Sequence, residues 1–170
     1  EDYKGISWLD AGSKQVWDYT VAIAKESYNI GFDELNFDYI RFPSDGDMYD
    51  IKYPFSEEQV IADPNYGKAE VMRGFFKYLA EEMEDTDAVL SADMFGMVTT
   101  NPDDLNIGQV LEYAEPYFDY IAPMTYPSHY PKGFNGYPNP NKEVYGVIKY
   151  SMDQAVRRMN EASSTPSKIR

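Results

Sequence analysis

Charged and polar side chains interrupt or end three apolar runs of the chain. Asp38 and Arg41 lie in FDELNFDYIRFP, Asp93 lies in AVLSADMFGM, and the run FDYIAPMTYPSHY continues into an aromatic loop. A charge inside a buried strand has to be paired or used, because burying an unpaired charge is costly. Asp38 is therefore either the partner of a basic residue in a neighbouring strand or part of a site. Asp93 is either part of the same site or a cap of the turn that follows it.

The segments between these runs have the spacing of helices. Apolar periodicity and turn residues predict helices over 13–30, about 65–84, 106–117 and 143–162, and strands over 33–42, 88–97 and 118–130. Residues 43–64 are expected to form a loop, and residues 163–170 are expected to begin a fourth strand. The alternation indicates parallel strands joined by right-handed crossovers, a parallel (β/α) repeat of the α/β class. A small open sheet and a segment of a (β/α)8 barrel both fit this pattern.

The ends of the three predicted strands are expected to lie along one edge. In parallel α/β folds the carboxyl ends of the strands carry the chemistry. Alternation along the first strand adds a direction for each side chain. It predicts Asn36, Asp38 and Ile40 on one face and Phe37, Tyr39 and Arg41 on the other. Asp38 and Arg41 therefore need not touch.

Composition excludes several classes of function. Fifteen basic and 29 acidic residues give a net charge of −14, which repels nucleic acids and anionic membrane surfaces. No apolar run is long enough to cross a membrane, so we expect no membrane insertion. The 170 residues, 43% of them apolar, suit one domain. The 16 tyrosines either fill a core or form surfaces that grip sugars or peptides.

The sequence predicts neither a metal site nor a cofactor. The chain has no cysteine, and its single histidine, His129, cannot form a histidine-rich metal site. The acidic stretch 44–50 lacks the spacing and the closing glutamate of a calcium loop. A glycine-rich phosphate cradle and a serine nucleophile elbow are also absent from the sequence.

Four blocks of the chain resemble, in order, a bacterial family of putative glycosyl hydrolase domains. They are WLDAGSKQVWDY, GFDELNFDYIRFPSDG, LSADMFGM and FDYIAPMTYPSHYPKG. The family is assigned to the TIM-barrel glycosidases, so the resemblance implies that residues 1–170 form a single domain, an incomplete barrel containing about strands 4 to 6. It also implies an extracytoplasmic or cell-envelope location.

A more distant resemblance links the first strand to family 18 chitinases. Their fourth strand carries the motif D-x-x-D-x-D-x-E, and Asp33, Asn36, Asp38 and Ile40 occupy the same spacing here. Ile40 stands where the chitinases have their general acid, so their substrate-assisted mechanism is not expected. The element PMTY, which ends at Tyr126, is similar to the Met-x-Tyr element of their sixth strand.

These resemblances imply a hydrolytic site built from two carboxyl groups. Glycoside hydrolysis needs one carboxyl as acid and another as nucleophile or base, about 5 Å apart in retaining enzymes. We expect Asp38 to be the nucleophile or base and Asp93 the acid, because neighbouring strands are separated by about 4.8 Å. The expected substrate-binding residues are Asn36, Arg41, Tyr126, His129 and Tyr130. The alternative for His129 is a structural role, which is common for a lone histidine in a loop.

The sequence thus predicts a glycoside hydrolase that acts on a polysaccharide or a cell-envelope glycan. Two alternatives remain. A carbohydrate-binding pseudoenzyme is favoured by Ile40 at the position of the acid. A structural or protein-interaction domain would keep the fold for packing alone.

Overall fold

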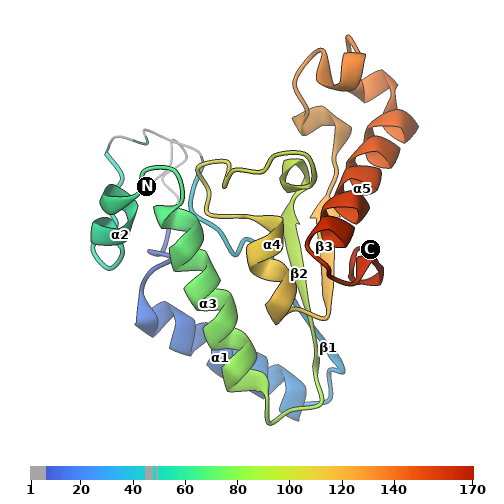
Figure 1. Cartoon of the computed structure of the whole chain (residues 1–170). Helices are drawn as coiled ribbons and strands as arrows, with labels where there is room; N and C mark the ends of the chain where they lie inside the picture. Colours follow the sequence, from blue (N-terminus) through green and yellow to red (C-terminus); the bar gives the residue numbers. More distant parts are fainter. Residues whose placement is uncertain (1–6, 45–47, 49) are drawn as a thin grey trace.

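Three parallel strands form one small sheet in the computed structural model of the chain, which describes residues 7–44, 48 and 50–170 (Figure 1). The strands are β1 (Glu34–Phe37), β2 (Val89–Phe95) and β3 (Tyr120–Met124), in the spatial order β1-β2-β3. The predicted parallel β/α repeat is confirmed, and the fold is mixed α/β.

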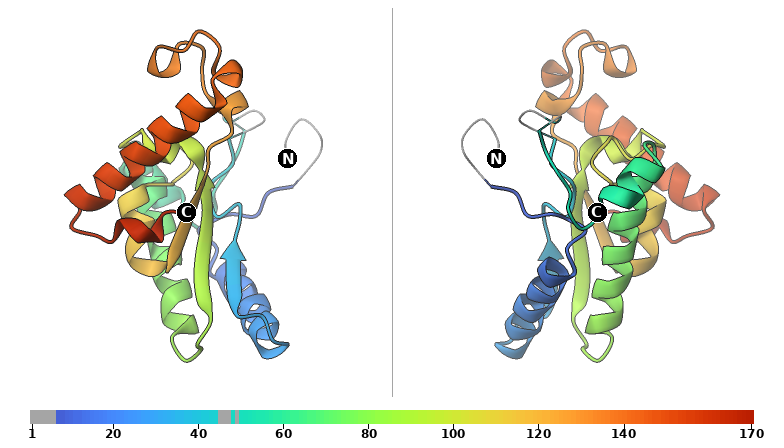
Figure 2. Two further views of the ribbon diagram at one scale, coloured as in Figure 1. Left: turned by 90° about the vertical axis from the view of Figure 1, so that its right-hand side faces the viewer. Right: turned by 90° about the vertical axis from the view of Figure 1, so that its left-hand side faces the viewer.

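Helices connect and cover these strands. They are α1 (Lys14–Asn29), α2 (Glu57–Ala62), α3 (Gly67–Met83), α4 (Leu111–Ala114) and α5 (Val144–Glu161). Short 3₁₀ turns are η1 (Gly96–Thr99), η2 (Glu115–Tyr117), η3 (Pro127–His129), η4 (Phe134–Gly136), η5 (Pro140–Lys142) and η6 (Pro166–Lys168). Helices α3, α4 and α5 lie on one side of the sheet (Figure 2). The predicted helices therefore exist, although α4 is much shorter than expected.

Two local differences from the predictions have physical causes. Helix α2 lies where a loop was expected, because six residues are too short to show helical periodicity. The predicted helix over 106–117 does not begin until Leu111, because Leu105, Asn106 and Gly108 all have positive φ. A left-handed backbone is incompatible with a right-handed helix.

The helix-facing side of the sheet is apolar. Its buried residues are Leu35, Phe37, Leu90, Ala92, Met94 and Ile121, and they belong to the core together with Phe76 and Leu79 of α3. Alternation along each strand sends these side chains to one face and their polar neighbours to the other. Burial of this face therefore fixes which side chains remain for the opposite face.

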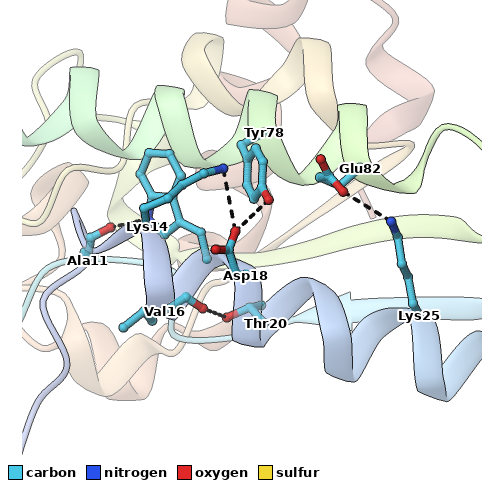
Figure 3. Close-up of polar contacts among 9 residues, drawn as sticks. Ala11, Lys14, Val16, Asp18, Thr20, Lys25, Tyr78 and Glu82 are labelled. Carbon is cyan, nitrogen blue, oxygen red and sulfur yellow. Dashed lines mark hydrogen bonds and ion pairs between the residues drawn. The ribbon is translucent and has the colours of Figure 1, made fainter.

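Polar contacts join α1 to α3 outside the core (Figure 3). The Tyr78 hydroxyl donates to Asp18 Oδ1 at 2.7 Å, and Lys25 Nζ lies 3.2 Å from Glu82 Oε2. Trp17 packs against Phe75 and Tyr78 at the same interface. These contacts keep α1 beside α3.

The strand β1 is shorter than the predicted 33–42 and ends at Phe37. Tyr39 has φ +54°, a left-handed conformation that interrupts the alternation. As a result Ile40 is only 8% exposed and joins the core with Phe37. The prediction that Ile40 shares a face with Asn36 and Asp38 is therefore wrong.

The expected fourth strand consists of a single parallel bridge. Ile169 bridges Ile121 of β3, and Arg170 N donates to Ile121 O at 3.0 Å. The segment after α5 thus adds to the outer edge of β3. The predicted third strand, 118–130, ends at Met124, because the chain turns into η3 at Pro127.

A buried glutamine joins the ends of β1 and β2. Gln109 is 1% exposed, its Nε2 donates to Ile40 O at 3.3 Å, and its Oε1 accepts from Phe95 N at 2.9 Å. One side chain therefore satisfies a backbone group after the end of β1 and another at the last residue of β2.

A buried lysine fixes the segment that follows β1. Lys68 Nζ donates to Asn106 O at 3.0 Å and to Asn106 Oδ1 at 2.9 Å, and it lies over the rings of Phe42 and Tyr53. Burial lowers the pKa of Lys68, and burial raises the pKa of the nearby Asp104 carboxyl. The amine and the carboxyl are thus both desolvated in the folded protein.

Replacing Gln109 by leucine should destabilise the protein by about 2–4 kcal/mol, because two buried backbone groups lose their partner. Urea denaturation measures the loss. Gln59→Leu on the exposed side of α2 is the matched control and should change stability by no more than about 0.5 kcal/mol. Equal effects of the two substitutions would contradict the assigned role of Gln109.

Lys68→Met should lower the free energy of unfolding by about 1–3 kcal/mol at pH 7. Loss of the cation raises the pKa of Asp104 further. A folded-state pKa above the unfolded value stabilises the protein in acid, and this stabilisation is lost as the pH rises. The difference between wild type and variant should therefore shrink from pH 7 to pH 4.5.

Urea denaturation at both pH values tests this dependence. Lys77→Met is the control, because Lys77 is exposed on the same helix and pairs only with Glu81 among the described residues. A stability difference of equal size at the two pH values would disprove the coupling between Lys68 and Asp104.

Candidate active site

A polar network covers the face of the sheet opposite the helices. Ser91 Oγ lies 2.7 Å from Glu34 Oε1 and 3.0 Å from Asn36 Oδ1. Asn36 Nδ2 donates to Asp93 Oδ2 at 2.9 Å. The register explains the network, since Asn36 pairs with Ser91 and alternation places Asp93 on the same face. The network therefore leads along β1 and β2 toward their carboxyl ends.

Asp38 and Asp93 are neighbours in the register of the sheet. Phe37 pairs with Ala92, so the next residue of each strand is one of the two aspartates. Asp38 Oδ1 accepts from Tyr39 N at 2.7 Å, whereas Asp93 contacts Asn36. Among the described residues no hydrogen bond joins the two carboxyl groups, and Asn36 is the residue of β1 that contacts Asp93.

The described contacts of the two aspartates do not include those of the structural roles that the sequence left open. The ion pairs of the described residues include neither Asp38 nor Asp93. The described contacts of Asp93 also include no backbone N–H of the turn that follows it. Among the residues that the structure describes, both carboxylates therefore lie at the strand ends without an ion-pair partner.

An aromatic group, the Phe95 cluster, lies at the ends of β2 and β3 and consists of Phe95, Tyr126 and His129. The His129 ring stacks on Phe95 with centroids 6.1 Å apart and meets Tyr126 edge to face at 5.4 Å. Gly96 permits this approach, because a Cβ there would lie 2.4 Å from Met124 O. Tyr126 and His129 are exposed, so the cluster offers ring surface to a ligand.

A second aromatic group, the Tyr39 cluster, lies at the end of β1 and consists of Trp8, Tyr39 and Arg41. The two rings are 6.1 Å apart, and the guanidinium carbon lies 5.3 Å from Trp8 and 5.1 Å from Tyr39. Arg41 Nη1 donates to Phe42 O and Ser44 Oγ. Arg41 therefore stays close to its own strand end.

The structure separates Tyr130 from the other predicted binding residues. Tyr130 is 5% exposed, its ring packs on Phe134, and its hydroxyl accepts from Ser151 of α5 at 3.0 Å. Burial raises the pKa of the Tyr130 hydroxyl, which therefore stays neutral. The ring and hydroxyl of Tyr130 face the protein interior, so Tyr130 is not part of the exposed aromatic surface at the strand ends.

Sequence reasoning missed Phe95, Tyr39 and Trp8 as residues of the strand ends. Phe95 follows Asp93 by two positions, so alternation alone would have placed it on the same face. Trp8 lies far from Tyr39 along the chain, and their contact has no sequence signal.

A cleft of about 680 Å³ runs along the outer edge of β1. Its lower part is apolar and lies between α1 and β1, with Ile23 and Phe32 among its lining residues. Its upper part reaches Asp38 and the Tyr39 cluster. The cleft therefore connects one carboxylate with an aromatic surface.

The described part of the chain offers no grouping of three or more histidine, aspartate or glutamate side chains that could hold a metal ion. Residues 45–47 and 49 of the acidic stretch 44–50 lie outside the described residues. Within the same described ranges, no helix is long and apolar enough to cross a membrane.

Comparison with known proteins identifies a family. The whole chain, residues 1–170, matches the sequence model of a family described as "Putative glycosyl hydrolase domain". No curated protein and no solved structure gives a significant match.

Proposed function

The chain belongs to the family of putative glycosyl hydrolase domains, and from this premise we propose that it hydrolyses glycosidic bonds in a polysaccharide or a cell-envelope glycan. The contact between Asn36 and Asp93, with Asp38 next in register, is the observation that carries the proposal. Two carboxyl groups at neighbouring strand ends are the arrangement that this chemistry uses. An extracytoplasmic location, where such glycans occur, is part of the same proposal.

We infer that the sheet is a segment of a (β/α)8 barrel, about strands 4 to 6. Two features of the sheet edges support this inference. Among the described residues β1 pairs only with β2, and Ile169 begins to extend the sheet beyond β3. The polar network would then line the inside of the barrel, and Asp38 and Asp93 would lie at its mouth.

The proposed roles follow from the contacts of each carboxyl group. Asp93 is proposed as the general acid, and the Asn36 amide, which donates to its Oδ2, fixes the direction of the carboxyl group. The proton of Asp93 passes to the leaving glycosidic oxygen. Asp38 is the nucleophile, which bonds to the anomeric carbon until water releases the sugar, or the base that takes a proton from the attacking water.

Asn36 and the Phe95 cluster complete the proposed site. Asn36 bonds to both Ser91 and Asp93, so it fixes the direction of the carboxyl group. The rings of Tyr126 and His129 offer the apolar faces and polar tips that suit sugars. Arg41 remains a proposed contact at the β1 side, where it lies between two rings.

One observation favours the alternative of a carbohydrate-binding pseudoenzyme. Ile40 occupies the position of the chitinase acid in the distant resemblance, and its side chain is buried in the core. No carboxyl group can therefore act from that position. The pseudoenzyme would bind a glycan at the same strand ends without cleaving it.

Replacing Asp38 or Asp93 by asparagine should lower the rate of reducing-end release about 10²–10⁴-fold, the range typical of lost acid or base catalysis. A panel of plant, fungal and bacterial cell-wall glycans serves as substrate, and glycan binding is measured alongside. Asp85→Asn is the control, because this exposed residue lies between α3 and β2, before the opposite end of the sheet.

Three results would count against the hydrolase. Unchanged activity of either asparagine variant eliminates that carboxyl group from catalysis. Glycan binding by the wild type without reducing-end release identifies the pseudoenzyme. The absence of both binding and release leaves the structural or protein-interaction role.

A further inference from the structure

Tyr39 combines a strained backbone with an exposed aromatic ring. Its φ is +54°, and 62% of the residue is exposed to solvent. A left-handed backbone is unfavourable for a bulky residue and persists only where the surrounding structure imposes it. Residues with such a backbone concentrate at binding and catalytic sites, so the exposed ring of Tyr39 indicates a binding site.

The surroundings of Tyr39 hold its ring in one place. Asp38 Oδ1 accepts from the Tyr39 N–H at 2.7 Å, which fixes the backbone. The Arg41 guanidinium lies near both rings and is itself bonded to Phe42 O. The Trp8 and Tyr39 rings are inclined by 56°, so they form an open corner rather than a closed stack.

The corner lies beside one of the proposed catalytic groups. Trp8, Asp38, Tyr39 and Arg41 all line the upper part of the 680 Å³ cleft, a volume within the range of small-ligand sites. The Tyr39 cluster lines the cleft at the β1 edge of the sheet together with Asp38, whereas the Phe95 cluster lies at the ends of β2 and β3. A ligand that reaches both clusters has to cross the carboxylates.

We propose that Trp8, Tyr39 and Arg41 form a glycan subsite that stacks one pyranose ring on the β1 side of Asp38. This inference rests on the proposed function and deepens it. With the Phe95 cluster holding units on the other side, the substrate is an oligosaccharide chain that is cleaved at internal bonds. A flat aromatic face suits the apolar face of a pyranose, and the tyrosine hydroxyl and the guanidinium serve its hydroxyl groups.

The charge distribution selects a neutral sugar for this subsite. The protein carries a net charge of −14, and Asp38 lies next to Tyr39 in the chain. Both repel an anionic unit. The Arg41 guanidinium is partly committed to the two rings and to Phe42 O, so it does not offset this repulsion.

The intrinsic fluorescence of Trp8 tests the subsite directly. The chain has two tryptophans, and Trp17, which packs against Phe75 and Tyr78, also lines the 680 Å³ cleft. The titration is therefore carried out in a Trp17→Phe background, in which Trp8 is the remaining tryptophan. Cello-, chito- and xylo-oligosaccharides of two to six units are titrated into the Asp93→Asn variant to prevent turnover. At least one series should change the Trp8 emission, with affinity that increases with chain length.

Tyr39→Asn in the same background removes the ring, and asparagine tolerates the left-handed backbone. We expect about tenfold weaker binding of the longest oligosaccharide, a loss on the scale of one aromatic contact, and little change for the disaccharide. The melting temperature should stay within a few degrees of the parent. Tyr145→Asn on α5 is the matched control, because Tyr145 is 79% exposed and should leave binding unchanged.

The outcomes separate the subsite from the proposed hydrolase. A change of Trp8 emission that Tyr39→Asn weakens, in a protein whose wild type releases no reducing ends, supports the subsite and rejects the hydrolase. Hydrolysis with equal binding by the parent and Tyr39→Asn rejects the subsite alone. No change of Trp8 emission with any of the three series also rejects the subsite.

Discussion

The parallel register between β1 and β2 is the constraint on which the candidate site depends. Phe37 opposite Ala92 puts Asn36 and Asp93 on the same face, within hydrogen-bond distance. Because side chains alternate with a period of two, a slip by one residue would send one strand's polar groups into the core. The apolar residues between the polar ones, such as Leu35 and Leu90, prevent that slip by being buried against α3. The core thus sets the geometry of the opposite face.

The end of β1 shows how the same chain leaves this geometry. Asp38 is the last residue before the left-handed Tyr39, and Ile40 then enters the core. Because β1 has ended, the carbonyl of Ile40 has no strand partner among the described residues. The Gln109 side chain donates to this carbonyl and accepts from the N–H of Phe95. The change of backbone direction therefore places an aspartate at the boundary between ordered strand and aromatic surface. A regular strand would have carried Tyr39 to the helix-facing side instead.

The sequence predicted the elements better than the contacts between them. Helix periodicity and apolar runs are local, so α1, α3, α5 and all three strands could be predicted. A left-handed backbone is usually predicted from a glycine, and here the residue is a tyrosine, Tyr39. The predicted alternation therefore continued past Tyr39 and placed Ile40 on the wrong face. In the sequence Tyr130 belongs to the same aromatic loop as the exposed Tyr126 and His129. Its burial depends on packing against α5, where Ser151 donates to its hydroxyl, and the sequence does not show that contact. Asp38, Asp93 and Asn36 could be predicted as neighbours because parallel strands align their ends.

The cations of the described chain explain why these carboxylates remain available. Arg158 binds Glu112, Arg170 binds Glu34, and Arg41 lies between two rings. The described partners of these guanidinium groups do not include Asp38 or Asp93, whose own described partners are a backbone N–H and an amide. Such neutral donors orient a carboxylate without cancelling its charge. In the proposed function this property belongs to Asp38, because a carboxylate that is oriented but not neutralised can stabilise the positive charge of an oxocarbenium-like transition state.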